Sequence, residues 1–140
     1  MPEWIKKYLV LENDDKTFMI QDVLKASQII KKQTGQYIPV VLDVHHYNCK
    51  NNGEKPNYEL IAETWKWTGK KPKIHLSSPK GEGRDFRTHA EYIDFDYAKP
   101  IFDELNEADF DADVMMEAPG KDLAVEPLVE WYKNSYLKEE

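Results

Sequence analysis

Residues Ile38-Pro39-Val40-Val41-Leu42-Asp43 form a short apolar run that ends on a carboxylate, and the polar stretch Val44-His45-His46-Tyr47-Asn48 follows it. An apolar run of this length is typical of a strand that is buried on both faces of a parallel sheet. We therefore predict a strand over 38–43 and a loop over 44–48. The same unit recurs on both sides of this stretch, and the remaining elements follow from that repetition.

Three more strands and four helices are expected along the chain. The strands lie near residues 8–12, 72–76 and 112–117, and apolar residues recur at helical spacing over 21–34, 58–67, 98–106 and 123–137. Strands that alternate with helices imply a parallel sheet. Four such units make half of a (β/α)8 barrel, because a full barrel needs about 250 residues. The expected fold is α/β with TIM-barrel-like (β/α) repeats, in a single half-barrel domain of residues 1–140.

The composition favours one globular domain without a membrane partner. Hydrophobic residues make up 41% of the chain, yet no run approaches the ~20 apolar residues that cross a bilayer. The N-terminus has no signal-peptide pattern, so a cytoplasmic protein is expected. The net charge of −7 argues against passive DNA binding, although the ligand carboxylates of a metalloenzyme would contribute to that charge.

Each predicted strand ends on a residue that can bind a metal ion. These residues are Glu12, Asp43, His75 and Glu117. In a parallel barrel, active-site groups project from the carboxyl ends of the strands, so the four side chains should converge there. Carboxylate and imidazole ligands suit Mn²⁺, Zn²⁺ or Mg²⁺. The alternative is that these are solvated polar residues at strand ends.

Three further residues extend this candidate cluster. His46 lies three residues after Asp43, and His89 follows the glycine-rich loop after the third strand. Lys73 lies two residues before His75, so both side chains should point to the same face of the sheet. Lys73 would then form an ion pair with Glu12 or Asp43, or carry a carboxylated amine near the metal ions.

Two further features of the sequence, His45 and the pair Trp65 and Trp67, are explained by structural roles. His45 points in another direction than His46 and is interpreted as structural. Trp65 and Trp67 could stack on bases, but residues two apart on a helix face different ways, which favours packing for at least one of them.

Six motifs stand in order along the chain: Leu9–Asp15, Ile38–His46, Thr64–Trp65, Pro72–Ser78, His89–Ile93 and Asp113–Ala118. Together they resemble successive motifs of the UV-damage endonuclease family, over nearly the whole sequence. The resemblance implies a DNA-repair hydrolase that cuts a phosphodiester on the 5′ side of UV photoproducts. It also implies a cluster of divalent metal ions, with manganese the first choice and zinc or magnesium as alternatives.

The resemblance also assigns roles to individual residues. It implies metal ligands at Glu12, Asp43, His46, His75, His89 and Glu117, and a modified lysine at Lys73. We predict that Glu12, Glu117 and Lys73 are catalytic. Arg84 and Arg87 lie on the loop after the third strand, on the side expected to face UV-damaged double-stranded DNA, and are predicted to contact phosphates.

The sequence departs from the family in two places. In the family, the preceding half of the barrel supplies further metal-binding histidines and the residues that probe damaged bases, and nothing before Tyr8 supplies them here. After Ala118 the family tends to a basic residue, whereas this chain has Pro119-Gly120. An N-terminal half-barrel chain or self-association would complete the barrel and cover its open edges.

Two other functions are considered. A sugar isomerase or epimerase barrel has a similar Glu, Asp, His, Glu set around a single metal ion, but it has no need of His46, His89 and Lys73. A non-catalytic truncated remnant would keep these ligands without a complete site.

Overall fold

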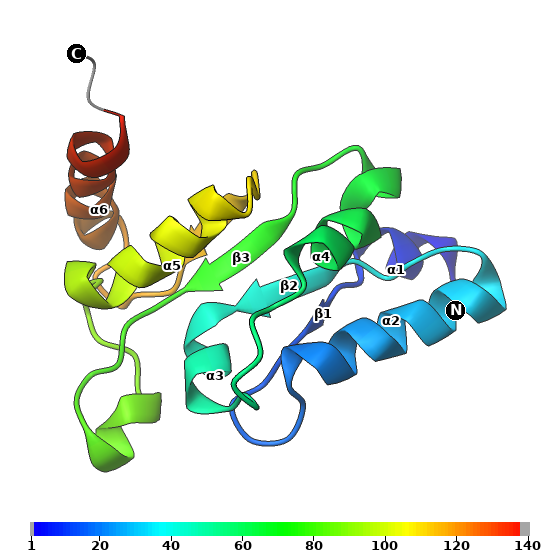
Figure 1. The fold of residues 1–140 in the computed structure, drawn as a ribbon, viewed down its shortest axis with the longest axis horizontal. Helices are drawn as coiled ribbons and strands as arrows, with labels where there is room; N and C mark the ends of the chain where they lie inside the picture. The colour runs from blue at the N-terminus through cyan, green and yellow to red at the C-terminus, as the bar shows by residue number, and fades with distance from the viewer. Residues whose placement is uncertain (1, 138–140) are drawn as a thin grey trace.

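The structure of the chain is a computed structural model that describes residues 2–137, except for the side chain of Arg84. Helices and strands alternate along most of this range (Figure 1). The elements are, in order, α1 (Glu3–Tyr8), β1 (Leu11–Glu12), α2 (Ile20–Thr34), β2 (Val40–Asp43), α3 (Val44–Cys49), α4 (Tyr58–Trp65), η1 (Lys66–Thr68), β3 (Lys73–Leu76), η2 (Gly83–Arg87), α5 (Phe95–Glu107), β4 (Asp113–Met116) and α6 (Asp122–Tyr136).

The four strands form one parallel sheet in the order β1-β2-β3-β4. Glu12 lies opposite Val41, and Asp43 lies opposite His75. Strands that are neighbours in the sequence are therefore also neighbours in the sheet, as four successive β-α units require. The predicted parallel (β/α) repeat is confirmed.

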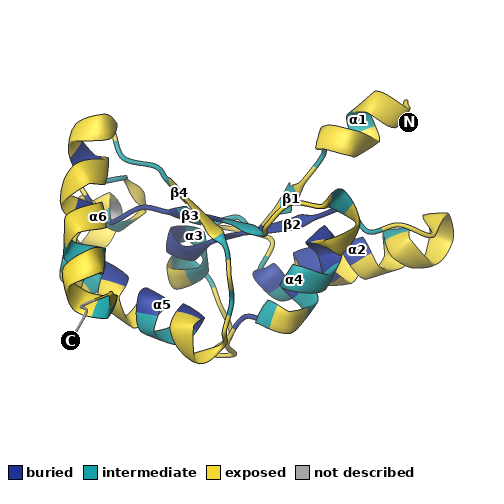
Figure 2. Cartoon of the chain, turned by 90° about the horizontal axis from the view of Figure 1, so that it is seen from above, coloured by how far each residue is buried: buried dark blue, intermediate teal, exposed yellow. Residues whose placement is uncertain are grey.

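The two faces of the sheet differ in composition because side chains alternate along a strand. Val40, Leu42, Ile74 and Leu76 lie on one face, are almost fully buried, and belong to the hydrophobic core with residues of α2, α4 and α5. Figure 2 shows these helices on one side of the sheet and α1 on the other. The face opposite the helices carries Glu12, Asp43 and His75. The core thus packs against one face of the sheet, and the polar strand ends lie on the other, open face.

Side-chain hydrogen bonds fasten α4 to the start of β2. The buried Thr64 hydroxyl accepts the N–H of Val40 at 3.0 Å and donates to the carbonyl of Ile61 at 2.7 Å. The indole N–H of Trp65 donates to the carbonyl of Val40 at 2.7 Å. Trp65 is therefore a core residue, as the packing interpretation expected, and its polar atom is satisfied by the strand that the helix covers.

Two local predictions are wrong. The stretch after Asp43 is the helix α3 rather than a loop, because the Asp43 carboxylate accepts the backbone N–H of His46 at 2.8 Å and so caps the helix. The first strand covers only Leu11–Glu12, whereas Tyr8 belongs to α1 and is 69% exposed. The apolar run before Leu11 has no strand opposite it, since the register pairs Leu11 with the first residue of β2.

Replacing Thr64 by Val should lower the free energy of unfolding by roughly 1–3 kcal/mol, because it leaves the buried N–H of Val40 without an acceptor. The matched control is Thr34→Val at the exposed end of α2, where water can replace the bond to Ile30, and a change below about 0.5 kcal/mol is expected. Urea unfolding of both variants measures the difference. Equal losses would contradict the role given to Thr64.

Candidate metal centre

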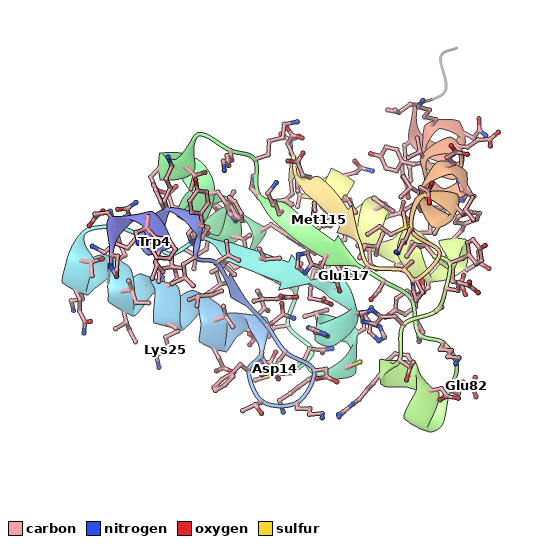
Figure 3. The ribbon with its side chains drawn as sticks, turned by 180° about the vertical axis from the view of Figure 1, so that it is seen from behind. Trp4, Asp14, Lys25, Glu82, Met115 and Glu117 are labelled. Atoms are coloured by element: carbon pink, nitrogen blue, oxygen red, sulfur yellow. The ribbon has the colours of Figure 1, made fainter. Side chains whose placement is uncertain are left out.

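The carboxyl ends of the four strands bring five of the six predicted ligands together. Donor atoms lie within 4.8 Å of one another in two groups of described residues. The first group is Glu12, Asp43 and His46, and the second is Asp43, His75 and Glu117. Glu117 follows β4 and continues its ladder, because its N–H bonds the carbonyl of Leu76 at 2.8 Å. Figure 3 shows Glu117 beside the ends of β2 and β3.

His75 is surrounded by carboxylates. Its Nδ1 lies 2.9 Å from Glu12 Oε1, 3.3 Å from Glu117 Oε1 and 4.0 Å from Asp43 Oδ2. The hydrogen bond to Glu12, together with the charges of the three carboxylates, outweighs partial burial and raises the pKa of His75. A positive charge is therefore favoured at this point among the strand ends.

Asp43 is the buried member shared by both groups. Its Oδ1 caps α3, while its buried Oδ2 has no hydrogen-bond partner within the described part of the chain. Oδ2 lies 3.6 Å from Nδ1 of His46. A buried carboxylate oxygen without a partner is costly, and a bound cation would satisfy it. The donor set, carboxylate oxygens and imidazole nitrogens, fits Mn²⁺ or Zn²⁺ and is less typical of Mg²⁺.

The two carboxylates of the first group differ in acidity. Burial, to which the neighbouring Glu12 adds, raises the pKa of Asp43 to about 6, against the opposing bond and charge of His46. For Glu12, burial favours the neutral form, but the hydrogen bond and charge of His75 outweigh it, and its pKa lies below the usual range. In the absence of a cation, Glu12 is thus the ionised partner of His75, and Asp43 holds a proton up to unusually high pH.

His46 reaches the cluster from the first turn of α3. Its Nδ1 lies 2.9 Å from the backbone carbonyl of Asn13 and 3.9 Å from Glu12 Oε1. His46 lies three residues after Asp43, and the turn of the capped helix brings its imidazole back toward the end of β2. The ligand role of His46 stays a prediction, but the structure places it where that role requires.

Lys73 and His89 are not among the clustered residues. Lys73 shares the face of His75, as expected, but its Nζ pairs with Asp113 Oδ2 at 3.4 Å instead of with Glu12 or Asp43. The register explains this pairing, because Lys73 and Asp113 lie directly opposite each other. Both lie two residues before the pair formed by His75 and Met115, nearer the amino ends of β3 and β4. The His89 ring instead lies edge-on to the His45 ring, with their centroids 5.7 Å apart.

His45 has the structural position that was expected. It is fully buried, its Nδ1 lies 3.0 Å from the Tyr97 hydroxyl, and its Nε2 lies 3.8 Å from the Cys49 thiol. Burial, with smaller contributions from His89 and His46, lowers its pKa. The neutral ring therefore connects α3 to α5.

Arg87, one of the two predicted phosphate contacts, lies against the loop that follows β1. Arg87 Nε is 3.7 Å from Asp15 Oδ2, so the segment after β3 reaches the loop after β1. The side chain of Arg84 lies outside the described residues. Contact of either arginine with DNA stays a prediction.

One polar residue of the site was missed in the sequence. Asn13 is 1% exposed and forms hydrogen bonds with both Asp43 and His46. It stands within the first family-like motif, but an asparagine after a strand-end acid looks like an ordinary loop residue. Its role depends on contacts about thirty positions away, which a single sequence does not reveal.

In the ion-free protein, the contribution of Asp43 to stability should fall as the pH rises from about 4 to 7. A folded-state pKa raised above the unfolded value means that the folded state binds more protons in this window, so protonated Asp43 stabilises at low pH and that contribution disappears as the pH passes about 6. The raised pKa of His75 also makes stability fall as the pH rises, but at pH values above the usual histidine pKa. Asp43→Asn should reduce the loss by roughly 1–3 kcal/mol.

Urea unfolding in the presence of a chelator measures this effect. Asp111→Asn, an exposed carboxylate before β4, is the control and should follow the wild-type profile. Parallel pH profiles for Asp43→Asn and the wild type would contradict the assignment.

Within residues 2–137 the longest apolar helical segments fall short of a membrane span.

Comparison with known proteins gives a consistent family. The family model described as UV-endonuclease UvdE matches residues 1–138. The UV DNA damage endonuclease of Bacillus cereus strain G9842 is 41% identical over 133 residues, which cover 93% of this chain and 39% of that protein. The corresponding protein of Bacillus anthracis strain A0248 is 42% identical over 128 residues, 89% of this chain and 38% of that protein.

A solved structure is similar as well. The crystal structure of SacUVDE matches with a TM-score of 0.75 and 32% identity, over 96% of this chain and 42% of that chain. The chain therefore spans about two fifths of the length of the relatives that it matches. Its sheet corresponds to part of a TIM-barrel-like fold. The chain belongs to the UV-endonuclease UvdE family.

Proposed function

We propose that this chain supplies the metal-binding part of an endonuclease that hydrolyses a DNA phosphodiester on the 5′ side of UV photoproducts. One observation supports this above others: in a member of this family, the buried Oδ2 of Asp43, which has no partner among the described residues, lies among ligand-type side chains from all four strand ends. The substrate proposed is UV-damaged double-stranded DNA.

Glu12, Asp43, His46, His75 and Glu117 would hold the divalent ions, with Mn²⁺ proposed first. Bound divalent ions supply an activated water and stabilise the leaving oxygen in phosphodiester hydrolysis. Glu12 and Glu117 contribute the negative charge at the two sides of His75, and Asp43 joins the two groups. Two overlapping groups support more than one ion, and this favours the nuclease over a sugar isomerase with a single metal.

Lys73 and His89 are also proposed to take part, although neither side chain lies within the cluster. Lys73 lies on the open face, where its pairing with Asp113 keeps it beside the site rather than within it. His89 would have to leave its contact with His45 in order to act as a ligand. Arg87, and Arg84 three residues before it, would contact phosphates next to the strand ends.

A partner that completes the barrel is also proposed, either an N-terminal half-barrel or a second copy. β1 and β4 are the edge strands of the sheet, and an edge strand presents unpaired backbone groups. Beside β4, a groove of about 770 Å³ is lined by apolar residues that include Val114, Met116 and Val129. Met115 on the same strand is 47% exposed. A partner strand and helix would cover this surface.

Glu12→Gln and Glu117→Gln should each weaken Mn²⁺ binding by at least about tenfold, because each removes an anionic ligand. Glu82→Gln is the matched control, since Glu82 is exposed on a loop distant from Glu117 (Figure 3) and should leave the affinity unchanged. Free Mn²⁺ measured by electron paramagnetic resonance gives the dissociation constants. Unaltered binding in both site variants would remove the ligand assignment.

The 140-residue chain alone should nick UV-irradiated plasmid little or not at all with Mn²⁺ present, and nicking should appear when the N-terminal half of a related enzyme is added. The reason is that the chain covers 39% of its relatives and leaves two sheet edges open. Unirradiated plasmid and the Glu12→Gln chain are the controls. Lesion-specific nicking by a demonstrated monomer of this chain would disprove the need for a partner.

A further inference from the structure

Asn13, Asp43 and His46 form a closed ring of side chain to backbone hydrogen bonds. The Asn13 amide pairs with the backbone of Asp43 in both directions, accepting its N–H at 2.9 Å and donating to its carbonyl at 3.0 Å. The Asp43 carboxylate accepts the N–H of His46 at 2.8 Å. His46 Nδ1 completes the ring at 2.9 Å from the carbonyl of Asn13.

The ring leaves specific atoms free. A backbone carbonyl can only accept, so the contact with Asn13 requires the proton of a neutral His46 to be on Nδ1 and leaves the lone pair on Nε2. Oδ1 of Asp43 is used by the helix cap, and Oδ2 has no hydrogen-bond partner among residues 2–137 as described. Nε2 of His46 and Oδ2 of Asp43 are the atoms left over, and each is the type of donor that a divalent ion binds. The ring atom nearest Oδ2 is the protonated Nδ1, at 3.6 Å.

Asparagine is suited to this position because its amide has the same donor and acceptor as a peptide group. β1 ends at Glu12, so no strand residue of β1 is paired with the backbone of Asp43. The Asn13 side chain takes that place. Aspartate in its ionised form lacks the donor, and an aliphatic residue lacks both groups, so either would leave buried backbone atoms unpaired.

We infer that Asn13 is a positioning residue, which through this ring fixes the carboxylate of Asp43 and the tautomer of His46 for binding of a divalent cation. The inference deepens the proposed function and rests on it for the identity of the ligand. Asn13 itself contributes no atom to the cation. Its effect is to hold two ligands from β2 and α3 in one orientation before the cation binds.

The first test measures the ring without any metal. In the ion-free wild type at a pH where His46 is neutral, ¹⁵N chemical shifts of the ring should show one tautomer, with the proton on Nδ1. Asn13→Ala and the similarly shaped Asn13→Leu should show a mixture of tautomers. A wild-type His46 with its proton on Nε2 would overturn the inference, even if neither variant folds.

The second test measures the consequence for Mn²⁺. Both Asn13 variants should bind Mn²⁺ about 10 to 100 times more weakly, the effect typical of losing a group that orients a ligand. Ser27→Ala is the matched control, because Ser27 is also fully buried and donates to the carbonyl of Ile38 at 2.6 Å, near the opposite end of β2. It should lower stability but change the affinity by less than about threefold.

The outcomes separate the inference from the proposed function. If folded Asn13 variants keep the wild-type tautomer and affinity, or if Ser27→Ala lowers the affinity equally, Asn13 is only a structural residue and the inference fails. If the wild type binds no Mn²⁺, the proposed metal centre fails, and the tautomer measurement still decides whether Asn13 orients His46.

Discussion

The site depends on the parallel direction of the four strands. Because β1 to β4 run the same way and pair in sequential order, their carboxyl ends meet at one edge, and the residue that ends each strand meets its neighbours. The register then sets the fine placement, with Asp43 opposite His75. If neighbouring strands ran antiparallel, the residues that end them would lie at opposite ends of the sheet.

The same alternation of side chains produces the buried face and the face that carries the candidate site. Leu42 and Ile74 are buried under the helices, while Asp43 and His75, their immediate neighbours in sequence, point the other way. Burial of the carboxylate of Asp43 is unfavourable in isolation, and α3 recovers part of that cost through its capping bond. No group in the described part of the chain satisfies the remaining oxygen, which is expected at a binding site rather than in a purely structural core.

The sequence predicts the strands and the polar residues at their ends well because both depend on local patterns. Apolar runs located β2 and β3, and a polar residue at the end of each run located Asp43 and His75. Three features depended on contacts that no local pattern contains. The helix α3 required the side chain of Asp43 to act as a cap, Lys73 paired across the register with Asp113, and Asn13 is explained only by atoms of β2 and α3.

The edges of the sheet follow from the same geometry as the site. A parallel sheet of four strands cannot close upon itself, so β1 and β4 retain unpaired sides, and apolar residues such as Met115 stay exposed on the edge strand. Glu12 and Glu117 come from these two edge strands or directly after them, whereas Asp43 and His75 come from the centre. The central pair therefore lies on strands with a neighbour on each side, whereas each member of the outer pair lies at the end of a strand that has one neighbour in the described sheet.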